Sequence, residues 1–414
     1  MKAEALARAA KEASHTIAHI PTETKDNVLN ILKELIFKKE DYLIRENRKD
    51  IEAAESAGLQ KSLIDRLRID TKAIEEMQAS MRDVGALPDP VGEIVKVWKR
   101  PNGLLVGRMR IPIGVIFVIY ESRPNVTLEA FSLCLKSGNC VILKGGSEAH
   151  HSNIALFTLI TEALQDAGVP GNAAHLIGTN DRAYIYELLK MDDYIDLVIP
   201  RGGEALIRSV VEQSRIPVLK HYKGVCHVFI DKSADMEIAY RVCMNAKVQK
   251  PATCNAMETL LVHESIAQTF LAHMAGMMQK EGVRLKGCDR TLNVLKDIES
   301  AEEKDWYEEY LDLVLSIKVV RDIDEAIAHI RQYGSTHTDA IITTNYDNAW
   351  KFLREVNSSL VLVNASTRLN DGFQLGLGAE MGISTTKLHA FGPMGLEELT
   401  VTKFIAFGEG QIRT

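Results

Sequence analysis

The sequence predicts an α/β protein with two tandem α/β domains, each built on a mainly parallel sheet, and a small β arm. Three observations lead to this fold class. Short apolar runs alternate with helical patterns in residues 114–222 and again in residues 225–365, as expected for parallel strands joined by helical crossovers. Two alternating segments around a Pro-Asn-Gly turn come before the first series. The length of 414 residues suits two or three domains at roughly 150 residues each.

The N-terminal region, residues 1–85, is expected to be helical. Ala, Leu, Ile and long charged residues recur there at helical spacing. Pro21 and Gly58 mark breaks between the helices. We expect these helices to serve packing.

An alternating pattern begins at residue 93 and reads EIVKVWKR, then Pro-Asn-Gly, then LLVGRMRI, which predicts a β-hairpin. A further exposed strand is expected in the C-terminal segment LEELTVTKFIAFGEG. Strands with open edges need partners. We therefore assign residues 93–112 and 396–414 to an oligomerisation hairpin and C-terminal strand, and expect at least a dimer.

Ten apolar runs are expected to form the two parallel sheets. The runs of the first sheet are GVIFVIY (114–120), CVILKGG (140–146), AHLIG (174–178), DLVIPRGG (196–203) and IPVLKHY (216–222). The runs of the second sheet are VCHVFID (225–231), METLLVH (257–263), LVLSIKVV (313–320), DAIITTN (339–345) and SLVLVNA (359–365).

The domain boundary is expected after residue 224. The first domain then comprises residues 1–92 and 113–224, and the second comprises residues 225–395. An acidic stretch, ESAEEKDWYEE (299–309), divides the second domain but contains two aromatic residues, which argues against a linker.

Composition and charge exclude several classes of function. Hydrophobic residues make up 46% and charged residues 25%, as in ordinary globular proteins. Lys and Arg total 49 against 56 for Asp and Glu, so there is no basic footprint for nucleic acid.

The longest apolar stretch, Ile111 to Tyr120, is well short of the roughly 20 residues that span a bilayer. The charged N-terminus lacks a signal-peptide core, and six cysteines without a C-x-x-C pair suit a reducing compartment. We expect a cytoplasmic protein.

The strongest local signal is NAKVQKPATCNAMETLLVH, in which Cys254 occupies a small polar turn just before an apolar strand. A thiolate there would be a good nucleophile, and Lys247 or Lys250 would lower the pKa of the thiol. The alternative is small buried filler, the usual role of a free cysteine. The other five cysteines are expected to have that role: Cys134, Cys140, Cys226, Cys243 and Cys288.

An apolar strand ends in Lys144, and Gly145, Gly146 and Ser147 follow it before a helix. Glycines allow close backbone approach, a helix N-terminus offers N–H groups, and the lysine adds a positive charge. The turn therefore suits a phosphate or a ribose. The alternative is an ordinary strand-to-helix turn with a solvated lysine.

A second turn of this kind contains Arg201, Gly202 and Gly203 before another helix. Neither turn matches the G-x-G-x-x-G fingerprint. The segment GLGAEMG (376–382) resembles that fingerprint superficially, but its last glycine is one residue late and no strand leads directly into it. We expect a loop there.

No metal site is expected. His15 and His19 are four residues apart on an expected helix, and His150 and His151 are adjacent. Neither pair comes with a metal-ligand motif. Solvated helix faces are the favoured interpretation.

The segments YESRPNVTLEA, VILKGGSEA, GVCHVFIDKSAD, QKPATCNAMETLLVH, EYLDLVLSIKVV, YGSTHTDAI and GLEELTVTKF together resemble the gamma-glutamyl phosphate reductases of the aldehyde dehydrogenase superfamily. The resemblance covers nearly the whole chain. It implies an aldehyde dehydrogenase-like fold with an NADP-binding domain followed by a catalytic domain. The implied reaction is NADPH-dependent reduction of L-glutamyl 5-phosphate to L-glutamate 5-semialdehyde with release of phosphate, the second step of proline biosynthesis.

The resemblance also implies roles for single residues. Cys254 would form a thioester that accepts hydride, and Asn125 would help to stabilise the oxyanion. Lys144 matches the lysine that contacts the adenosine ribose. Glu309 is similar to the glutamate that holds the nicotinamide ribose, although Leu311 replaces the aromatic residue of that motif.

Ser147 stands where NAD-using relatives often carry an acidic residue, which favours NADP(H) because no charge there repels the 2'-phosphate. Glu148 is its neighbour. Lys220 stands where hydrolytic aldehyde dehydrogenases usually carry the glutamate that activates water, which fits a reductase. Arg123 and Arg201 are candidates for binding the substrate phosphate or carboxylate, with structural ion pairs as the alternative.

Two other functions stay open. A hydrolytic NAD(P)-dependent aldehyde dehydrogenase is disfavoured by Lys220. A catalytically silent dinucleotide-binding or assembly scaffold is disfavoured because Cys254, Asn125, Lys144 and Glu309 occur together. The superfamily pairs such an arm across subunits, which implies a homo-oligomer, and a contact with glutamate kinase is left open.

Overall fold

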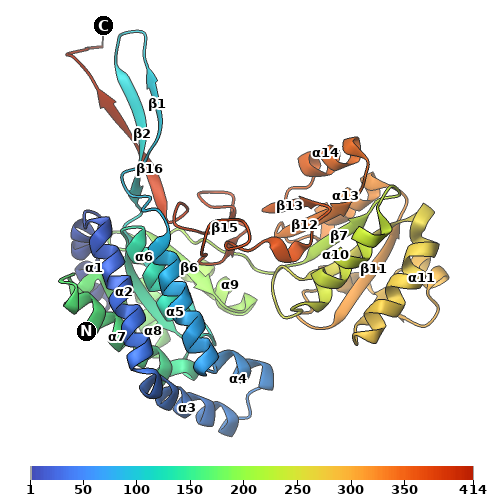
Figure 1. Ribbon diagram of the computed structural model, residues 1–414, viewed down its shortest axis with the longest axis horizontal. Helices are drawn as coiled ribbons and strands as arrows, with labels where there is room; N and C mark the ends of the chain where they lie inside the picture. Colours follow the sequence, from blue (N-terminus) through green and yellow to red (C-terminus); the bar gives the residue numbers. More distant parts are fainter. Residues whose placement is uncertain (1, 414) are drawn as a thin grey trace. The chain divides into compact units, whose positions relative to one another are not determined.

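The chain divides into two compact units, seen in a computed structural model that describes residues 2–413 (Figure 1). The first unit comprises Met1–Lys220, Gly376–Gly382 and Met394–Thr414, and the second comprises His221–Leu375 and Ile383–Pro393. The first crossover between the units therefore comes at residue 220 rather than 224.

The loop 376–382 belongs to the first unit, whereas the sequence pattern placed it in the second domain. The reason lies in its contacts. Gly378 lies so close to Leu87 that an added Cβ would come within 2.2 Å of the leucine side chain. The amide of Met381 also donates to the carbonyl of Met394. The loop carries no regular structure, as expected.

Helices form the N-terminal region, as the spacing predicts, and the breaks fall where Pro21 and Gly58 place them. Pro21 precedes the second helix, and Gly58 has a left-handed φ of 69° after the third. The helices are α1 (Ala3–Ile17), α2 (Thr22–Lys38), α3 (Glu40–Ser56), α4 (Lys61–Leu67) and α5 (Thr71–Ala86).

A four-stranded parallel sheet forms the core of the first unit, in the order β5-β4-β3-β6. Its strands are β3 (Val115–Tyr120), β4 (Cys140–Gly145), β5 (Ala174–Leu176) and β6 (Leu197–Arg201). The connecting helices are α6 (Val126–Lys136), α7 (His150–Asp166), α8 (Arg182–Leu188) and α9 (Glu204–Gln213). Short 3-10 turns occur at η1 (Ser147–Ala149) and η2 (Gly171–Ala173).

The expected fifth strand of this sheet, IPVLKHY, is not a strand. It makes a single parallel bridge, between Val198 and Val218. Pro217 lacks an N–H and can only accept a hydrogen bond, which it does from the amide of Val198. The apolar residues here cover the edge of the sheet without extending it.

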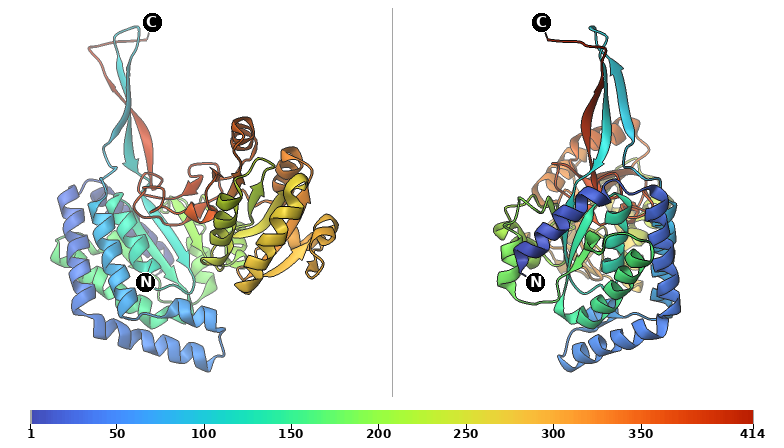
Figure 2. Two further views of the ribbon diagram at one scale, coloured as in Figure 1. Left: turned by 45° about the vertical axis from the view of Figure 1, so that its right-hand side comes forward. Right: turned by 90° about the vertical axis from the view of Figure 1, so that its left-hand side faces the viewer.

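The β arm consists of β1 (Ile94–Lys99), β2 (Leu105–Pro112) and β16 (Thr400–Phe407), all antiparallel in the order β1-β2-β16. The three strands lie side by side in every view (Figures 1 and 2). The predicted hairpin is confirmed, and the C-terminal strand pairs with it inside one chain.

The second unit is built on a seven-stranded parallel sheet, in the order β10-β9-β11-β8-β7-β12-β13. Its strands are β7 (Cys226–Ile230), β8 (Met257–His263), β9 (Arg284–Gly287), β10 (Glu299–Ser300), β11 (Val314–Val320), β12 (Thr338–Ile342) and β13 (Leu360–Val363). The five expected apolar runs are all strands. The sequence did not predict the short strand β9 or the edge strand β10 beside it.

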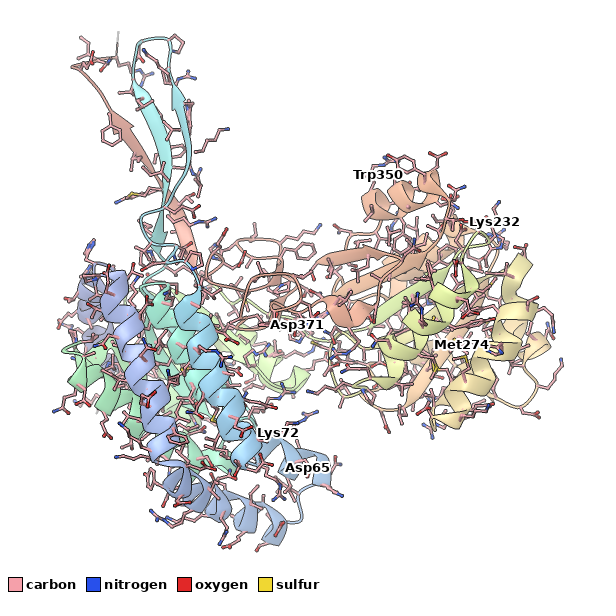
Figure 3. The ribbon with its side chains drawn as sticks, viewed as in Figure 1. Asp65, Lys72, Lys232, Met274, Trp350 and Asp371 are labelled. Atoms are coloured by element: carbon pink, nitrogen blue, oxygen red, sulfur yellow. The ribbon has the colours of Figure 1, made fainter. Side chains whose placement is uncertain are left out.

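Helices bury both faces of this sheet, which explains why its strands read as continuous apolar runs. Val228 packs in one cluster with α10 (Met236–Val248) and α11 (Glu264–Lys280), including Met274 (Figure 3). Its neighbour Phe229 packs in a second cluster with α13 (Ile323–Tyr333) and α14 (Tyr346–Glu355). The remaining elements are α12 (Asp289–Val294), η3 (Glu303–Tyr307), η4 (Thr367–Leu369), β14 (Ile383–Ser384) and β15 (Gly392–Pro393).

The acidic stretch 299–309 is part of the fold and not a linker. It supplies the edge strand β10 and the turn η3, and its Trp306 is buried. Within residues 2–413, none of the helices has the length and apolar character that a membrane crossing needs.

Candidate active site

The turn after β4 carries the residues expected to contact a dinucleotide. The Lys144 ammonium donates to the carbonyl of Gly145 at 2.6 Å and to Oδ1 of Asn180 at 3.2 Å. Burial lowers the pKa of Lys144. A small pocket opens at this turn, at the carboxyl ends of β4 and β5, where parallel sheets place their ligands. It is lined by Lys144, Gly145, Gly146, His150, Asn153, Ile154, Leu176, Ile177, Gly178 and Asn180.

The two glycines of this turn are required by the chain's own side chains. An added Cβ on Gly145 would lie 2.1 Å from the amide nitrogen of Asn153, and one on Gly146 would lie 2.2 Å from the Glu148 carboxylate. Glu148 in turn accepts hydrogen bonds from the amide and the hydroxyl of Ser122, at 2.6 and 2.9 Å. Ser147 is exposed and begins η1.

The second glycine turn, after β6, already holds an anion. The amide of Gly203, at the start of α9, donates to Oε2 of Glu121 at 2.8 Å. A Cβ on Gly202 would lie 2.2 Å from the same oxygen. A phosphate at this turn would therefore compete with a carboxylate of the chain.

Arg201, at the end of β6, lies against Gly382 of the loop 376–382, where an added Cβ would come within 1.7 Å of the guanidinium. Among residues 2–413 the guanidinium of Arg201 forms no ion pair, so the structural ion pair considered as an alternative is absent there. Arg123 is exposed on the turn after β3.

Asn125 lies at the start of α6, after a strained turn in which Ser122 has a left-handed φ of 49°. The hydrogen bonds from Ser122 to Glu148 hold this conformation. The side-chain amide of Asn125 donates one N–H to Oε1 of Glu129 at 2.7 Å. An amide nitrogen carries two hydrogens, so one remains for a ligand while Glu129 orients the group.

In the second unit, Cys254 lies in the loop between α10 and β8 and is half-buried. All six cysteines are free thiols. The predicted buried role is confirmed for Cys134, Cys140, Cys226 and Cys243. Burial raises the pKa of Cys140 to about 12 and that of the other three above their usual range. Cys288 differs from the prediction because it precedes α12 at the surface and is half-buried.

Gly224 brings Cys254 and Glu309 together. A Cβ on Gly224 would lie 1.8 Å from the carbonyl oxygen of Cys254, so the two backbones touch. The amide of Gly224 donates to Oε1 of Glu309 at 2.8 Å. The thiol of Cys226 donates to the same Cys254 carbonyl at 3.2 Å. Two residues expected from the sequence therefore share one backbone neighbour.

These residues gather at the amino ends of the strands. Gly224 precedes β7, Cys254 precedes β8, Glu309 precedes β11, and His337 precedes β12. The four strands are parallel neighbours in the order β11-β8-β7-β12. Their amino ends therefore meet at one edge of the sheet, opposite to the edge that parallel sheets usually use for ligands.

Lys247 does not have the expected role beside Cys254. It is completely buried and pairs with the equally buried Glu258, Nζ to Oε2, at 2.6 Å. Burial lowers the pKa of Lys247 and raises that of Glu258, while the charge and hydrogen bond of each partner oppose that shift. The other oxygen of Glu258 accepts from the amide of Leu311, whose φ of 52° is left-handed. The pair thus supports the turn that carries Glu309. Lys250, the second expected cation, is exposed.

Arg368, on η4, lies beside the cysteine loop, since its guanidinium bonds Asn255, the residue after Cys254, and sequence reasoning missed it. Its Nε donates to Oε1 of Gln249 at 2.9 Å, and its Nη1 donates to Oδ1 of Asn255. The Asn255 amide donates to the carbonyl of Asn370 at 3.0 Å. Burial lowers the pKa of Arg368, while Cys254 and Asp371 oppose that effect. No local signal in the segment NASTRLNDG points to this role.

Two histidines flank Cys254 and were also missed. One donor atom from each of His221, Cys254 and His337 lies within 4.8 Å of the others. The two imidazole rings are 5.6 Å apart. Burial lowers the pKa of His337 to about 4, so its ring is neutral at physiological pH. Both residues lie in segments that the sequence analysis quoted, IPVLKHY and YGSTHTDAI, but neither segment has a histidine motif.

Comparison with known proteins decides the family. The family model described as "Aldehyde dehydrogenase family" matches residues 1–291. The gamma-glutamyl phosphate reductase of Thermodesulfovibrio yellowstonii is 57% identical over 98% of this chain and 97% of its own length. The chain belongs to the gamma-glutamyl phosphate reductases of the aldehyde dehydrogenase family.

Two further gamma-glutamyl phosphate reductases agree with this placement. That of Desulfatibacillum aliphaticivorans is 55% identical over 99% of this chain and 98% of its own length. The crystal structure of the Thermotoga maritima reductase matches with a TM-score of 0.97 and 44% identity, covering 100% of both chains. The resemblance inferred from the motifs and the aldehyde dehydrogenase-like fold are therefore confirmed. As a member of this family, the chain is an oxidoreductase that uses a nicotinamide dinucleotide.

The buried pair beneath Glu309 gives a stability prediction. Glu258→Gln leaves the Lys247 charge buried without its partner, and we expect the free energy of unfolding to fall by about 3–5 kcal/mol. Changing both residues, Lys247→Met with Glu258→Leu, should cost much less because no unpaired charge remains. Urea denaturation measures both variants, and Glu264→Gln, an exposed glutamate on the following helix, is the control. A loss in Glu258→Gln no larger than in this control would contradict the prediction.

Proposed function

We propose that the chain catalyses NADPH-dependent reduction of L-glutamyl 5-phosphate to L-glutamate 5-semialdehyde with release of phosphate, the second step of proline biosynthesis. The observation that carries this proposal is the 57% identity, over nearly the whole of both chains, to a gamma-glutamyl phosphate reductase. The half-buried Cys254, with Arg368 and two histidines around it, supports it with a site suited to acyl transfer.

The first step is attack of the Cys254 sulfur on the acyl carbon. The new C–S bond forms a thioester, and the C–O bond to phosphate breaks. We assign His221 to take the thiol proton and return it to the departing phosphate, because one of its ring nitrogens lies within 4.8 Å of the Cys254 sulfur. His337 is less suited, because burial lowers the pKa of its ring to about 4 and so makes it a weak base.

Arg368 supplies positive charge for this step. Its guanidinium is fixed on Gln249 and Asn255, so its position does not depend on the substrate. A fixed cation beside the cysteine loop would stabilise the charge that develops on the leaving phosphate. By resemblance, Asn125 adds a hydrogen-bond donor for the oxyanion, and its bond to Glu129 orients that donor.

The residues at the β4 turn fit a dinucleotide. Lys144 projects into a pocket at the carboxyl ends of β4 and β5, and Glu309 is held by the amide of Gly224. By resemblance these residues contact the two riboses. The dinucleotide, when bound, supplies the hydride that reduces the thioester. Release of the aldehyde then breaks the C–S bond, and the Cys254 thiolate takes a proton from solvent.

Two features of this turn support NADP(H) over NAD(H). Ser147 is exposed and uncharged. Its neighbour Glu148 directs Oε1 to the amide and hydroxyl of Ser122. Neither residue then places a free carboxylate where it would repel a 2'-phosphate.

A charge at position 147 tests the cofactor preference. We expect Ser147→Glu to lower kcat/KM for NADPH by roughly tenfold or more through repulsion of the 2'-phosphate, with little effect on NADH. Ser147→Gln, which has the same size without the charge, is the matched control. Steady-state kinetics with both cofactors measures the effect, and equal losses for NADPH and NADH would refute the assignment.

The reverse reaction tests the acyl acceptor. Lys220 cannot act as the carboxylate that activates water, so the thioester should wait for phosphate. With glutamate 5-semialdehyde and NADP+, we expect NADPH to form only when inorganic phosphate or arsenate is added. Cys254→Ala should abolish the reaction, and Cys288→Ala should retain it. Comparable NADPH formation without phosphate, with glutamate as the product, would instead identify a hydrolytic aldehyde dehydrogenase.

We further propose a cytoplasmic homo-oligomer of at least two chains. The free cysteines support a reducing compartment. The arm supports assembly because β1 and β16 are open edges and their apolar residues are exposed. The exposed residues of the arm are Ile94, Val95, Val97, Leu105, Val401, Phe404 and Phe407.

Phe404 gives a test of assembly. Its side chain is 66% exposed on β16, and that of Phe37 on α2 is 60% exposed. We expect light scattering at micromolar concentration to show at least a dimer, and Phe404→Glu to shift the protein toward monomer while Phe37→Glu does not. Circular dichroism verifies that both variants are folded. A monomeric full-length protein would overturn the proposal.

A further inference from the structure

We propose that His221, Cys254 and His337 form a binding site for a thiophilic divalent cation, Zn²⁺ by its ligand chemistry, and that the bound ion blocks the nucleophile. The catalytic consequence rests on the proposed function. Binding of the ion does not.

The donor set suits zinc. Two imidazole nitrogens and one thiolate are ligands that Zn²⁺ prefers, and three protein ligands leave a fourth position open. The donor atoms of the three residues lie within 4.8 Å of one another. Around a tetrahedral zinc with bonds of about 2.0–2.3 Å, donors lie roughly 3.3–3.6 Å apart. Each pair must therefore close by at most about 1.5 Å, which small side-chain rotations can provide.

His337 supplies an independent observation. It is completely buried, and its Nε2 has no hydrogen-bond partner among residues 2–413. Its Nδ1 is already engaged with the hydroxyl of Thr338 at 2.7 Å. A buried ring nitrogen without a partner is unusual in folded proteins. The hydrogen bond at Nδ1 leaves Nε2 as the nitrogen available to a ligand, and it fixes the ring as outer partners do in metal sites.

The other two ligands are held differently. The backbone of Cys254 is fixed by its contact with Gly224 and by the hydrogen bond from Cys226. His221 lies outside the helices and strands, just after the crossover between the units. It is therefore the ligand expected to move when the ion binds. The positive charge of Arg368 acts on Cys254 and opposes a dication, so we expect weaker binding than in a closed four-ligand structural site.

Binding would inhibit the enzyme reversibly. The Cys254 thiol loses its proton to solvent, and the sulfur forms a bond to Zn²⁺. No electron is transferred, and a chelator that removes the ion restores the thiol. A sulfur whose lone pair is shared with zinc is a poor nucleophile toward an acyl phosphate.

The test uses the full-length enzyme with Zn²⁺ alone in calorimetry and with Co²⁺ as a spectroscopic probe. We expect one ion per chain and a thiolate-to-cobalt charge-transfer band in the near ultraviolet. Cys254→Ala should abolish the band, and His221→Gln or His337→Gln should weaken binding by at least about 100-fold. Cys288→Ala, which removes the other half-buried cysteine, should bind normally.

Other outcomes overturn the site. If Cys254→Ala still binds Zn²⁺ normally, or if the change of His150 and His151 to Gln removes binding, the ion binds elsewhere. Because His337 is buried, circular dichroism must show that the His337→Gln variant is folded. If that variant is unfolded, His221→Gln, which changes a half-buried ligand, tests the loss of zinc binding instead. An enzyme that gives the cobalt band but, once a chelator has removed the metal, still fails to reduce glutamyl phosphate would refute the proposed function and leave the metal site standing.

Discussion

The contact between Gly224 and Cys254 is the constraint on which the second unit's site depends. No side chain larger than hydrogen fits at position 224, so the segment before β7 can lie directly on the cysteine loop. In this arrangement the amide of Gly224 donates a hydrogen bond to the Glu309 carboxylate. The thiol of Cys226 donates a hydrogen bond to the carbonyl of Cys254. Cys254 is therefore held by its backbone, which leaves its sulfur available for the proposed attack.

The candidate site residues lie at opposite strand ends in the two units. In the first, Lys144 and Arg201 lie at the carboxyl ends of β4 and β6, where parallel sheets generally place their ligands. In the second, Cys254 and His337 precede their strands. At that edge a buried pair, Lys247 with Glu258, supports the turn at Leu311. Burying the two charged groups costs free energy because both lose water. In return the pair holds the turn that carries Glu309.

The sequence predicted what depends on local pattern. The ten apolar runs included nine true strands, because a strand buried on both faces must be apolar along its length. The exception, IPVLKHY, contains a proline that cannot donate to a sheet, and the missed strands β9 and β10 are short and polar. Cys254 and Glu309 were proposed from motifs, and both neighbour Gly224 in the structure. Arg368, His221 and His337 were not proposed, because parallel pairing brings them together from distant segments and no local pattern encodes that register.

The glycine turn after β6 binds an anion, as the general rule predicts, but the anion is a carboxylate of the chain itself. Both turns were expected to bind an anion, since a helix start with glycines exposes amide groups. In the structure the amide of Gly203 binds the carboxylate of Glu121, and Gly146 lies against Glu148. At the β6 turn this internal carboxylate satisfies the Gly203 amide before any dinucleotide binds. A phosphate there must displace the Glu121 carboxylate, and at either turn a nearby cation would attract it. Lys144, one residue before the end of β4, and Arg201, at the end of β6, would provide that attraction.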